Sequence, residues 1–313
     1  MRVLFVILIF LAMVNPVMAN DSSVAVTPNG LEFREEKGIL LEQEKLFINP
    51  KKIQIEYKFK NTTPNDIETE VAFPIPEYGP KFSSAAAGIP DFKDFTVRIN
   101  DSLVTPKKDV KALVNGQDYS ELLVKKKISI TNFARTEYGV LDGQLDQLKN
   151  KIGKDFERFK KLGIIDGDGF PLWNVSITYH WHMKFPAEKT ISVKHTYTPY
   201  TGYEYNYSDK MDSFTKVACL DAKAKTGVKK LSQKKNGVLK EWIPYILKTA
   251  NNWQKPINYF QLIVKKKSEQ VVSLCSDSSF TKTTSTELQL VIKDYIPTKD
   301  LTVYFFSEMA QGE

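Results

Sequence analysis

Apolar and polar residues alternate with a period of two through much of the chain. Between residues 173 and 185 every odd position is apolar and every even position is polar. The same alternation occupies residues 53–59 and 67–73, with the turn-forming residues 61–66 between them. A period of two is typical of strands with one buried face, and turn formers between two such runs are typical of a hairpin. The pattern therefore predicts a hairpin over residues 46–73.

Further alternating runs predict strands along most of the remaining chain. Residues 191–197 alternate back after a turn at 186–189, which predicts a second hairpin together with residues 173–185. Shorter runs predict strands at residues 95–99, 103–104, 259–264, 271–275, 287–292 and 301–306. The pattern lapses in a Tyr-rich segment around residues 203–207, which we interpret as a domain boundary.

One segment has the spacing of a helix rather than a strand. Its apolar residues recur every three or four positions, as on the buried face of a helix; they are Leu141, Leu145, Leu148, Ile152, Phe156 and Phe159. Asp142 is a suitable N-cap, and Gly163 is a suitable left-handed stop. The spacing predicts a long amphipathic helix over about residues 141–163. Pro244 predicts the start of a short second helix, because proline suits the first helical position.

These elements together predict a mainly β protein. Residues 20–202 are expected to form a sandwich-like antiparallel domain with the long helix inserted, and residues 203–313 a smaller α+β domain. A length of 313 residues allows one large or two ordinary domains, and 42% hydrophobic residues exclude a wholly disordered chain.

The first nineteen residues have the plan of a secretory signal peptide. Arg2 precedes an eleven-residue apolar run at 3–13, Asn15-Pro16 interrupts that run, and Ala19 suits a cleavage site. An uncleaved membrane anchor is the alternative, but a spanning helix needs about 20 apolar residues. We expect cleavage after Ala19, a periplasmic or secreted mature protein, and no transmembrane segment after cleavage.

The mature chain is moderately basic. The full sequence has 44 Lys and Arg against 37 Asp and Glu, and removal of Arg2 with the leader leaves 43 against 37, a net charge of +6. Lysine clusters at 125–127, 229–230, 234–235 and 265–267 suggest an anionic partner. Lysines at the ends of aliphatic runs also protect edge strands from aggregation, which is the alternative. The expected partners are another envelope protein or an anionic envelope polymer, and not nucleic acid.

The two cysteines, Cys219 and Cys275, both belong to the mature chain. An even number of cysteines in an oxidising compartment usually indicates a disulfide. A redox pair or a catalytic thiol is the alternative, but neither cysteine lies in a Cys-x-x-Cys motif. We predict a structural disulfide between Cys219 and Cys275.

All three histidines fall within the second predicted hairpin. His180 and His182 alternate on one strand and His195 lies on the next, so in one register the three could bind zinc with an open fourth position. In that register Ile191 and Val193 would lie on the polar face. The hydrophobic pattern instead favours a register that buries His195 and leaves His180 and His182 outside.

Several phrases resemble a known family. They are Asn20-Asp21-Ser22, Phe59-Lys60-Asn61-Thr62, Ala72-Phe73-Pro74-Ile75-Pro76, Phe185-Pro186-Ala187, His195-Thr196-Tyr197-Thr198-Pro199, Thr249-Ala250-Asn251-Asn252-Trp253 and Lys293-Asp294-Tyr295. As a set they resemble the bacterial exported family known as domain of unknown function 4424. The resemblance implies export to the bacterial envelope. It implies no established activity, so no catalytic residue and no cofactor follow from it.

A fainter resemblance is to the vault/inter-alpha-trypsin-inhibitor type domain. It is carried by the strand that ends at residues 73–77 and by the phrase at residues 186–197. By analogy it implies a β-sandwich used for protein contacts. The leading hypothesis is therefore a non-enzymatic envelope protein that binds another protein or a polymer. The rival is a metal-assisted envelope hydrolase that uses His180, His182 and His195.

Overall fold

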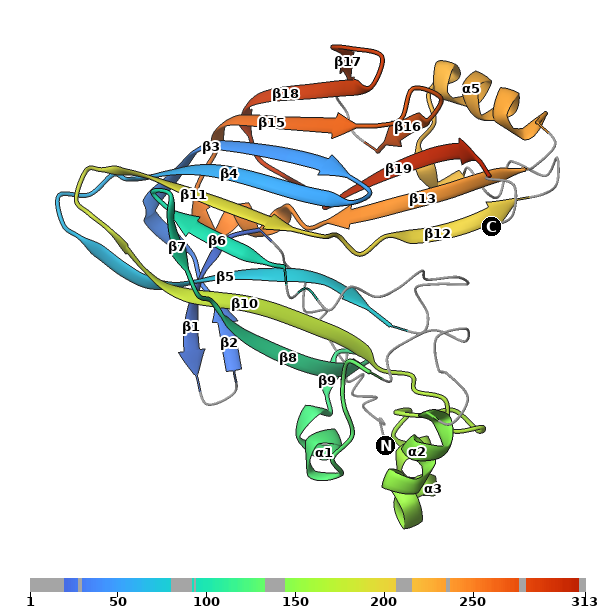
Figure 1. Ribbon diagram of the computed structural model, residues 1–313. Coiled ribbons are helices and arrows are strands. Elements are labelled where there is room, and N and C mark those ends of the chain that lie inside the picture. The colour runs from blue at the N-terminus through green and yellow to red at the C-terminus, as the bar shows by residue number, and fades with distance from the viewer. Residues whose placement is uncertain are drawn as a thin grey trace, which may run out of the picture.

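The computed structural model describes residues 20–27, 30–79, 92, 94–132, 144–206, 216–234, 237–275 and 280–309. These residues form a mainly β protein with three sheets (Figure 1). The prediction of a mainly β chain is confirmed. None of the helices in this part of the chain is long and apolar enough to cross a membrane.

The first sheet has six strands in the order β2-β1-β5-β10-β8-β9. Their bounds are β1 Ser22–Thr27, β2 Gly30–Phe33, β5 Ile67–Tyr78, β8 Lys107–Val114, β9 Gln117–Asp118 and β10 Asn174–Phe185. The central pair is β5 and β10, which run antiparallel with His180 opposite Ala72 and Trp181 opposite Val71.

The second sheet has nine strands. Eight follow the order β17-β18-β15-β3-β4-β11-β6-β7, and β14 also pairs with β3. Their bounds are β3 Glu36–Asn49, β4 Lys52–Asn61, β6 Thr96–Ile99, β7 Ser102–Val104, β11 Thr190–Tyr197, β14 Trp253–Gln254, β15 Ile257–Lys265, β17 Thr281–Lys282 and β18 Glu287–Tyr295. In Figure 1 this sheet lies over the first one, and their facing sides share one hydrophobic core.

The third sheet has four strands in the order β12-β13-β19-β16, with helix α5 beside it in Figure 1. The bounds are β12 Gly202–Asn206, β13 Val238–Tyr245, β16 Val271–Leu274, β19 Leu301–Glu308 and α5 Ala222–Ser232, and a 3-10 turn, η3, covers Lys216–Ala218. A smaller core of five buried residues lies between α5 and this sheet: Ala218, Val228, Leu231, Val238 and Phe306.

Both predicted hairpins are wrong in their pairing, although the strands and turns are present. Strand β4 pairs with β3 and β11 in the second sheet, whereas β5 pairs with β1 and β10 in the first. Likewise β10 and β11 lie in different sheets. Alternation specifies which face of a strand is buried, and two strands that face each other across a core satisfy it as well as two paired strands do. Each turn is therefore an arch between the sheets.

Asn61 ties the two arches together. Its Nδ2 donates to the carbonyl of Phe185 at 2.9 Å and to that of Asn65 at 2.8 Å. Its Oδ1 accepts from the backbone N–H and the hydroxyl of Thr63, at 2.9 and 2.8 Å. The backbone N–H of Asn61 also donates to the carbonyl of Lys189 at 3.0 Å. Asn61 is fully buried, so its amide satisfies the buried carbonyl of Phe185 and also binds the partly buried groups of Thr63 and Asn65.

The predicted long helix is divided. Helix α2 covers Gln144–Ile152, a 3-10 turn (η2) covers Gly153–Asp155, and α3 covers Phe156–Lys161. Gly153 has φ +56°, a conformation that glycine adopts without strain and that ends α2. Residues 141–143 lie outside the described residues. The buried stripe survives the break, because Leu148, Ile152 and Phe159 are fully buried.

Two shorter helices differ from the prediction as well. Pro244 lies within β13, and a 3-10 helix, η4, covers Lys248–Asn252 instead. Helix α5 and helix α1, Ser120–Lys125, were not predicted. Helix α1 is short and has a single buried residue, Leu123, so it gives no periodic helical signal in the sequence. Helix α5 buries Ala224, Val228 and Leu231 at helical spacing, a signal that the prediction missed.

The predicted boundary at residue 203 does not coincide with a division between sheets. Strand β15 pairs in parallel with β3, and β18 extends the same sheet beyond β15. The chain after residue 203 therefore contributes both to the second sheet and to the third. A parallel pair between distant parts of a chain leaves no local signal in the sequence.

Candidate functional site

The first described residues form the most enclosed polar segment of the protein. Asn20, Asp21 and Ser22 are fully buried, and Ser23 is 4% exposed. Four consecutive buried polar residues need hydrogen-bond partners in the interior. They find them in a group that we call the N-terminal polar cluster: Asn20, Asp21, Glu44, Tyr57, His195 and Tyr245.

One half of the cluster is a group of hydrogen bonds around Glu44. Asn20 Nδ2 donates to Glu44 Oε2 at 2.9 Å, and the Tyr245 hydroxyl donates to Glu44 Oε1 at 3.2 Å. The Tyr57 hydroxyl donates to Asn20 Oδ1, and its oxygen lies 3.1 Å from that of Tyr245. Because Glu44 and Tyr57 lie in the second sheet and Tyr245 in the third, these contacts join the two sheets to Asn20.

A β-bulge places Glu44 inside. Leu41 pairs with Phe59, but the register shifts before Gln43, so that Glu44 lies opposite Tyr57. The extra residue changes which side chains point inward. Glu44 therefore shares the buried face with Leu46. The sequence alone did not reveal this, because the bulge depends on pairing with β4.

The other half of the cluster is a buried Asp–His pair. His195 Nε2 lies 2.9 and 3.0 Å from the two carboxylate oxygens of Asp21. Four aromatic rings surround the imidazole, with centroids 5.2–5.6 Å away: Tyr57, Phe73, Phe95 and Trp181. His195 Nδ1 has no hydrogen-bond partner within the described part of the chain.

Helix η4 and β14 hold the segment from the outside. Trp253 Nε1 donates to the Asp21 carbonyl at 2.5 Å, and Asn252 Nδ2 donates to Ser22 Oγ at 2.7 Å. These are the residues of the Asn251-Asn252-Trp253 phrase. No role for them could be predicted from the sequence, because their partners lie about 230 residues away.

Burial dominates the electrostatics of the cluster. It raises the pKa of Glu44 to about 8, even though hydrogen bonds from Asn20 and Tyr245 lower it. Burial also raises the pKa of Asp21, while the neighbouring His195 lowers it. Charged forms are disfavoured where water is absent. These groups are fully buried, so the neighbours that affect their charge are interior side chains.

The three histidines are not brought together. His195 lies in the interior, on the buried face that the alternation favoured, and His180 and His182 lie on the opposite face of the first sheet. His180 Nδ1 lies 2.6 Å from Glu70 Oε1, and His182 Nε2 lies 3.5 Å from Glu68 Oε2. Across the described residues, no group of three or more His, Cys, Asp or Glu side chains could hold a metal ion.

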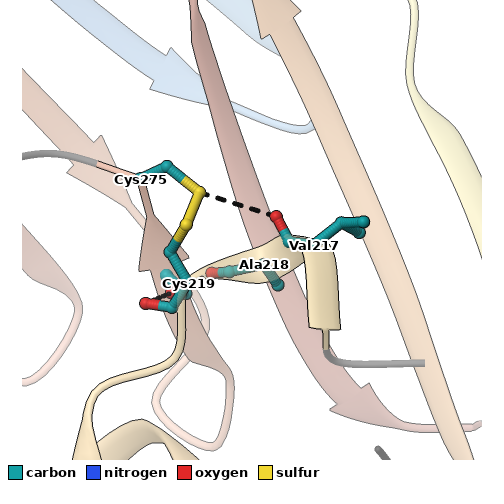
Figure 2. The surroundings of a disulfide bond; sticks show 5 residues. Val217, Ala218, Cys219 and Cys275 are labelled. Atoms are coloured by element: carbon teal, nitrogen blue, oxygen red, sulfur yellow. Dashed lines mark hydrogen bonds between the residues drawn. A yellow bond between two sulfur atoms is a disulfide. The ribbon is translucent and has the colours of Figure 1, made fainter. Parts of the chain in front are cut away.

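The cysteines lie at bonding distance. Cys219 and Cys275 have an S–S distance of 1.94 Å and a Cα–Cα distance of 5.1 Å (Figure 2). Ser273 Oγ donates to the carbonyl of Ala218 at 2.5 Å. The link and this hydrogen bond hold the turn before α5 against β16.

Helix α5 carries four exposed lysines. Its buried side is formed by Ala224, Val228 and Leu231, and its exposed side carries Lys223, Lys225, Lys229 and Lys230. We call these four residues the α5 lysine face. The helix contains no Asp or Glu, and within the described chain none of the four lysines forms an ion pair. Gly227 allows close packing, since a Cβ there would lie 2.7 Å from Val271 Cγ2.

Solved structures resemble this chain only distantly. A candidate nutrient-binding protein of Legionella pneumophila aligns over 92% of this chain and 70% of its own, with 14% identity and a TM-score of 0.45. An M1 zinc metallopeptidase of Deinococcus radiodurans aligns over 87% of this chain and 43% of its own, with 9% identity and a TM-score of 0.29. Similarity this low transfers neither a ligand nor an activity. No curated protein matches the chain.

A family model covers nearly the whole predicted mature chain. The model described as "Domain of unknown function (DUF4424)" matches residues 19–304. The family resemblance is confirmed. The resemblance to the vault/inter-alpha-trypsin-inhibitor type domain stays a prediction.

Proposed function

Because the chain belongs to the family of the domain of unknown function 4424, we propose its function from its own geometry: a non-enzymatic, exported envelope protein that binds an anionic envelope polymer or surface. Export rests on the leader-like residues 1–19. Binding rests on the α5 lysine face, and this face is the observation that carries the proposal.

The charge of α5 and its fixed position on the third sheet support an anionic partner. Four lysines on eleven residues lie along a helix of about 16 Å, so the positive potential is concentrated on one short rod. Lysines near an anionic lipid surface contribute about 1 kcal/mol each. The Cys219–Cys275 link and the buried residues of α5 fix the helix on the third sheet, so little ordering is needed on binding.

The enclosed N-terminal polar cluster supports a non-enzymatic role. A catalytic group must touch the substrate or reach it through one water. Asp21, Glu44 and His195 are fully buried, and the outward-facing His180 and His182 are paired with acids across strands β5 and β10. The rival, a hydrolase with one metal ion on His180, His182 and His195, would need side chains from opposite faces of a sheet to converge.

The test is binding of the mature chain to phosphate-bearing surfaces. We expect it to co-sediment with vesicles of phosphatidylglycerol and phosphatidylcholine but not with phosphatidylcholine alone, and binding to weaken as salt is raised. Soluble polyphosphate distinguishes a polymer from a lipid surface. If the protein recognises phosphate charge alone, polyphosphate should displace it from the vesicles.

Charge removal on two helices provides the matched comparison. Changing Lys223, Lys225, Lys229 and Lys230 to Gln is expected to weaken binding about tenfold or more. The control changes four exposed cations of the α2–α3 region to Gln; these are Lys154, Arg158, Lys160 and Lys161. It removes the same net charge beside the acids Asp155 and Glu157. If both variants lose the same amount of affinity, or if the unchanged protein binds neither the anionic vesicles nor polyphosphate, the proposal that α5 binds the partner is refuted.

A further inference from the structure

The N-terminal polar cluster contains one more acid than base. Asp21 and Glu44 are its acids, and His195 is the base that it contains among the described residues. The neighbours that influence Glu44 are Asn20, Tyr245 and Asp21, of which none is a cation. The buried Lys240 does not serve this purpose, because it pairs with Glu204 at 2.6 Å. A buried carboxylate without a cation is costly, so Glu44 is held mostly neutral at pH 7 unless a second base lies beside it.

Covalent geometry sets an upper limit on the distance between the main-chain nitrogen of Asn20 and Glu44. Covalent geometry keeps that nitrogen within about 5 Å of Nδ2 of the same residue, and Nδ2 is 2.9 Å from Glu44 Oε2. The nitrogen is therefore within about 8 Å of the Glu44 carboxylate. The side chain is also held in place, because the backbone N–H of Asp21 donates to Asn20 Oδ1 at 2.9 Å.

We propose that removal of residues 1–19 creates this missing base: the amino terminus of Asn20 becomes a buried ammonium that pairs with Glu44 and completes the fold. This inference rests on the export proposed above. A signal peptidase would hydrolyse the Ala19–Asn20 peptide bond with one water, leaving a carboxylate on Ala19 and an amine on Asn20. The amine takes up a proton from solvent.

The consequence is a fold that is complete only after processing. Before cleavage the Asn20 nitrogen is an uncharged amide, and Glu44 has no partner of opposite charge in the cluster. After cleavage, two charges that would each be unfavourable alone stabilise each other. An exported chain would thus gain this internal interaction only after cleavage.

The test is a comparison of four chains at pH 7. Two start at Asn20, and two carry a Gly-Ser extension before Asn20; in each pair one chain has Glu44 and the other Glu44→Gln. In the chain that starts at Asn20, Glu44→Gln is expected to raise the unfolding equilibrium constant by about tenfold or more. In the extended chain the same substitution is expected to leave that constant unchanged or lower it. Equal effects in both chains would overturn the proposal.

Two further measurements keep the result decisive. Glu42→Gln is the matched control, because Glu42 is two positions away and bonds the Thr190 hydroxyl at 3.0 Å on an exposed part of the sheet; it should behave alike in both chains. If Glu44→Gln fails to fold, reductive methylation of the chain that starts at Asn20 tests whether its amino terminus is buried. Its α-amine should react about tenfold or more slowly in the native state than in urea, and equal rates would exclude a buried ammonium.

Neither outcome depends on the α5 lysine face. A chain that fails to bind anionic vesicles but shows the Glu44 effect retains the buried amino terminus and refutes only the binding proposal. A chain that binds anionic vesicles but shows no Glu44 effect retains the binding proposal and refutes only the buried amino terminus. Intact mass of the exported protein separately tests whether it starts at Asn20.

Discussion

Truncation of Asn61 tests whether the two arches hold the sandwich together. Asn61→Ala removes four side-chain hydrogen bonds, two donated to the carbonyls of Phe185 and Asn65 and two accepted from Thr63. The Phe185 carbonyl is in a buried contact, and an unsatisfied buried group costs about 1–3 kcal/mol. The other groups are partly buried and can bond to water, at about 0.5 kcal/mol each. The expected loss is therefore about 3 kcal/mol.

Urea unfolding of the mature chain, followed by tryptophan fluorescence, measures this loss. Asn65→Ala is the matched control in the same turn, because the Asn65 side chain is exposed and it is the backbone of Asn65 that accepts the bond. We expect the control to stay within about 0.5 kcal/mol of the parent chain. If Asn61→Ala loses no more unfolding free energy than Asn65→Ala, the Asn61 amide does not hold the two arches together.

Three other predictions follow from single features. The oxidised mature chain should contain no free thiol by mass before reduction, and reduction of Cys219–Cys275 should lower the free energy of unfolding by about 4 kcal/mol for a loop of about 57 residues; two free thiols would contradict the link. In a chain extended before Asn20, the raised pKa of Glu44 means that the folded state holds a proton that the unfolded state releases. Stability should therefore fall by several kcal/mol between about pH 4.5 and pH 8, and a Glu44→Gln variant that keeps the full slope would refute this. Finally, His182→Ala should leave stability within about 0.5 kcal/mol and added zinc should not change the melting temperature; stoichiometric zinc that is lost on this substitution would restore the metal hypothesis.

The alternating pattern predicted strand positions and buried faces well, because both are local properties. Trp181 is 3% exposed and His195 is fully buried, on the sides that the parity of their strands requires. The same pattern could not choose strand partners. An arch and a hairpin use the same turn residues at 61–66 and bury the same faces, and only contacts between distant strands distinguish them.

The N-terminal polar cluster could not be predicted for a related reason. Asp21 meets His195 across 174 positions, and Tyr245 meets Glu44 across 201. Each residue alone is an ordinary polar residue in the sequence. The bulge before Gln43 that turns Glu44 inward depends on pairing with β4, so it leaves no periodic signal. The family phrase Asn20-Asp21-Ser22 marked the right place without indicating why it matters.

The division of the helical insertion has a local cause that the spacing concealed. Apolar residues continue at helical intervals through residues 145–159, but Gly153 takes a positive φ and turns the chain. Periodicity indicates which residues are buried. The conformation of Gly153 determines whether those residues lie on one helix or on two.

The most direct test of the central claim, that residues 20–23 are an interior part of the fold, is deletion of these residues. The melting temperatures of chains that start at Asn20 and at Val24 would be compared under identical conditions. Loss of the partners of Glu44, His195 and Trp253 is expected to cost about 4 kcal/mol or more, which lowers the melting temperature of a chain of this size by about 6 °C or more. Equal melting temperatures would contradict the claim.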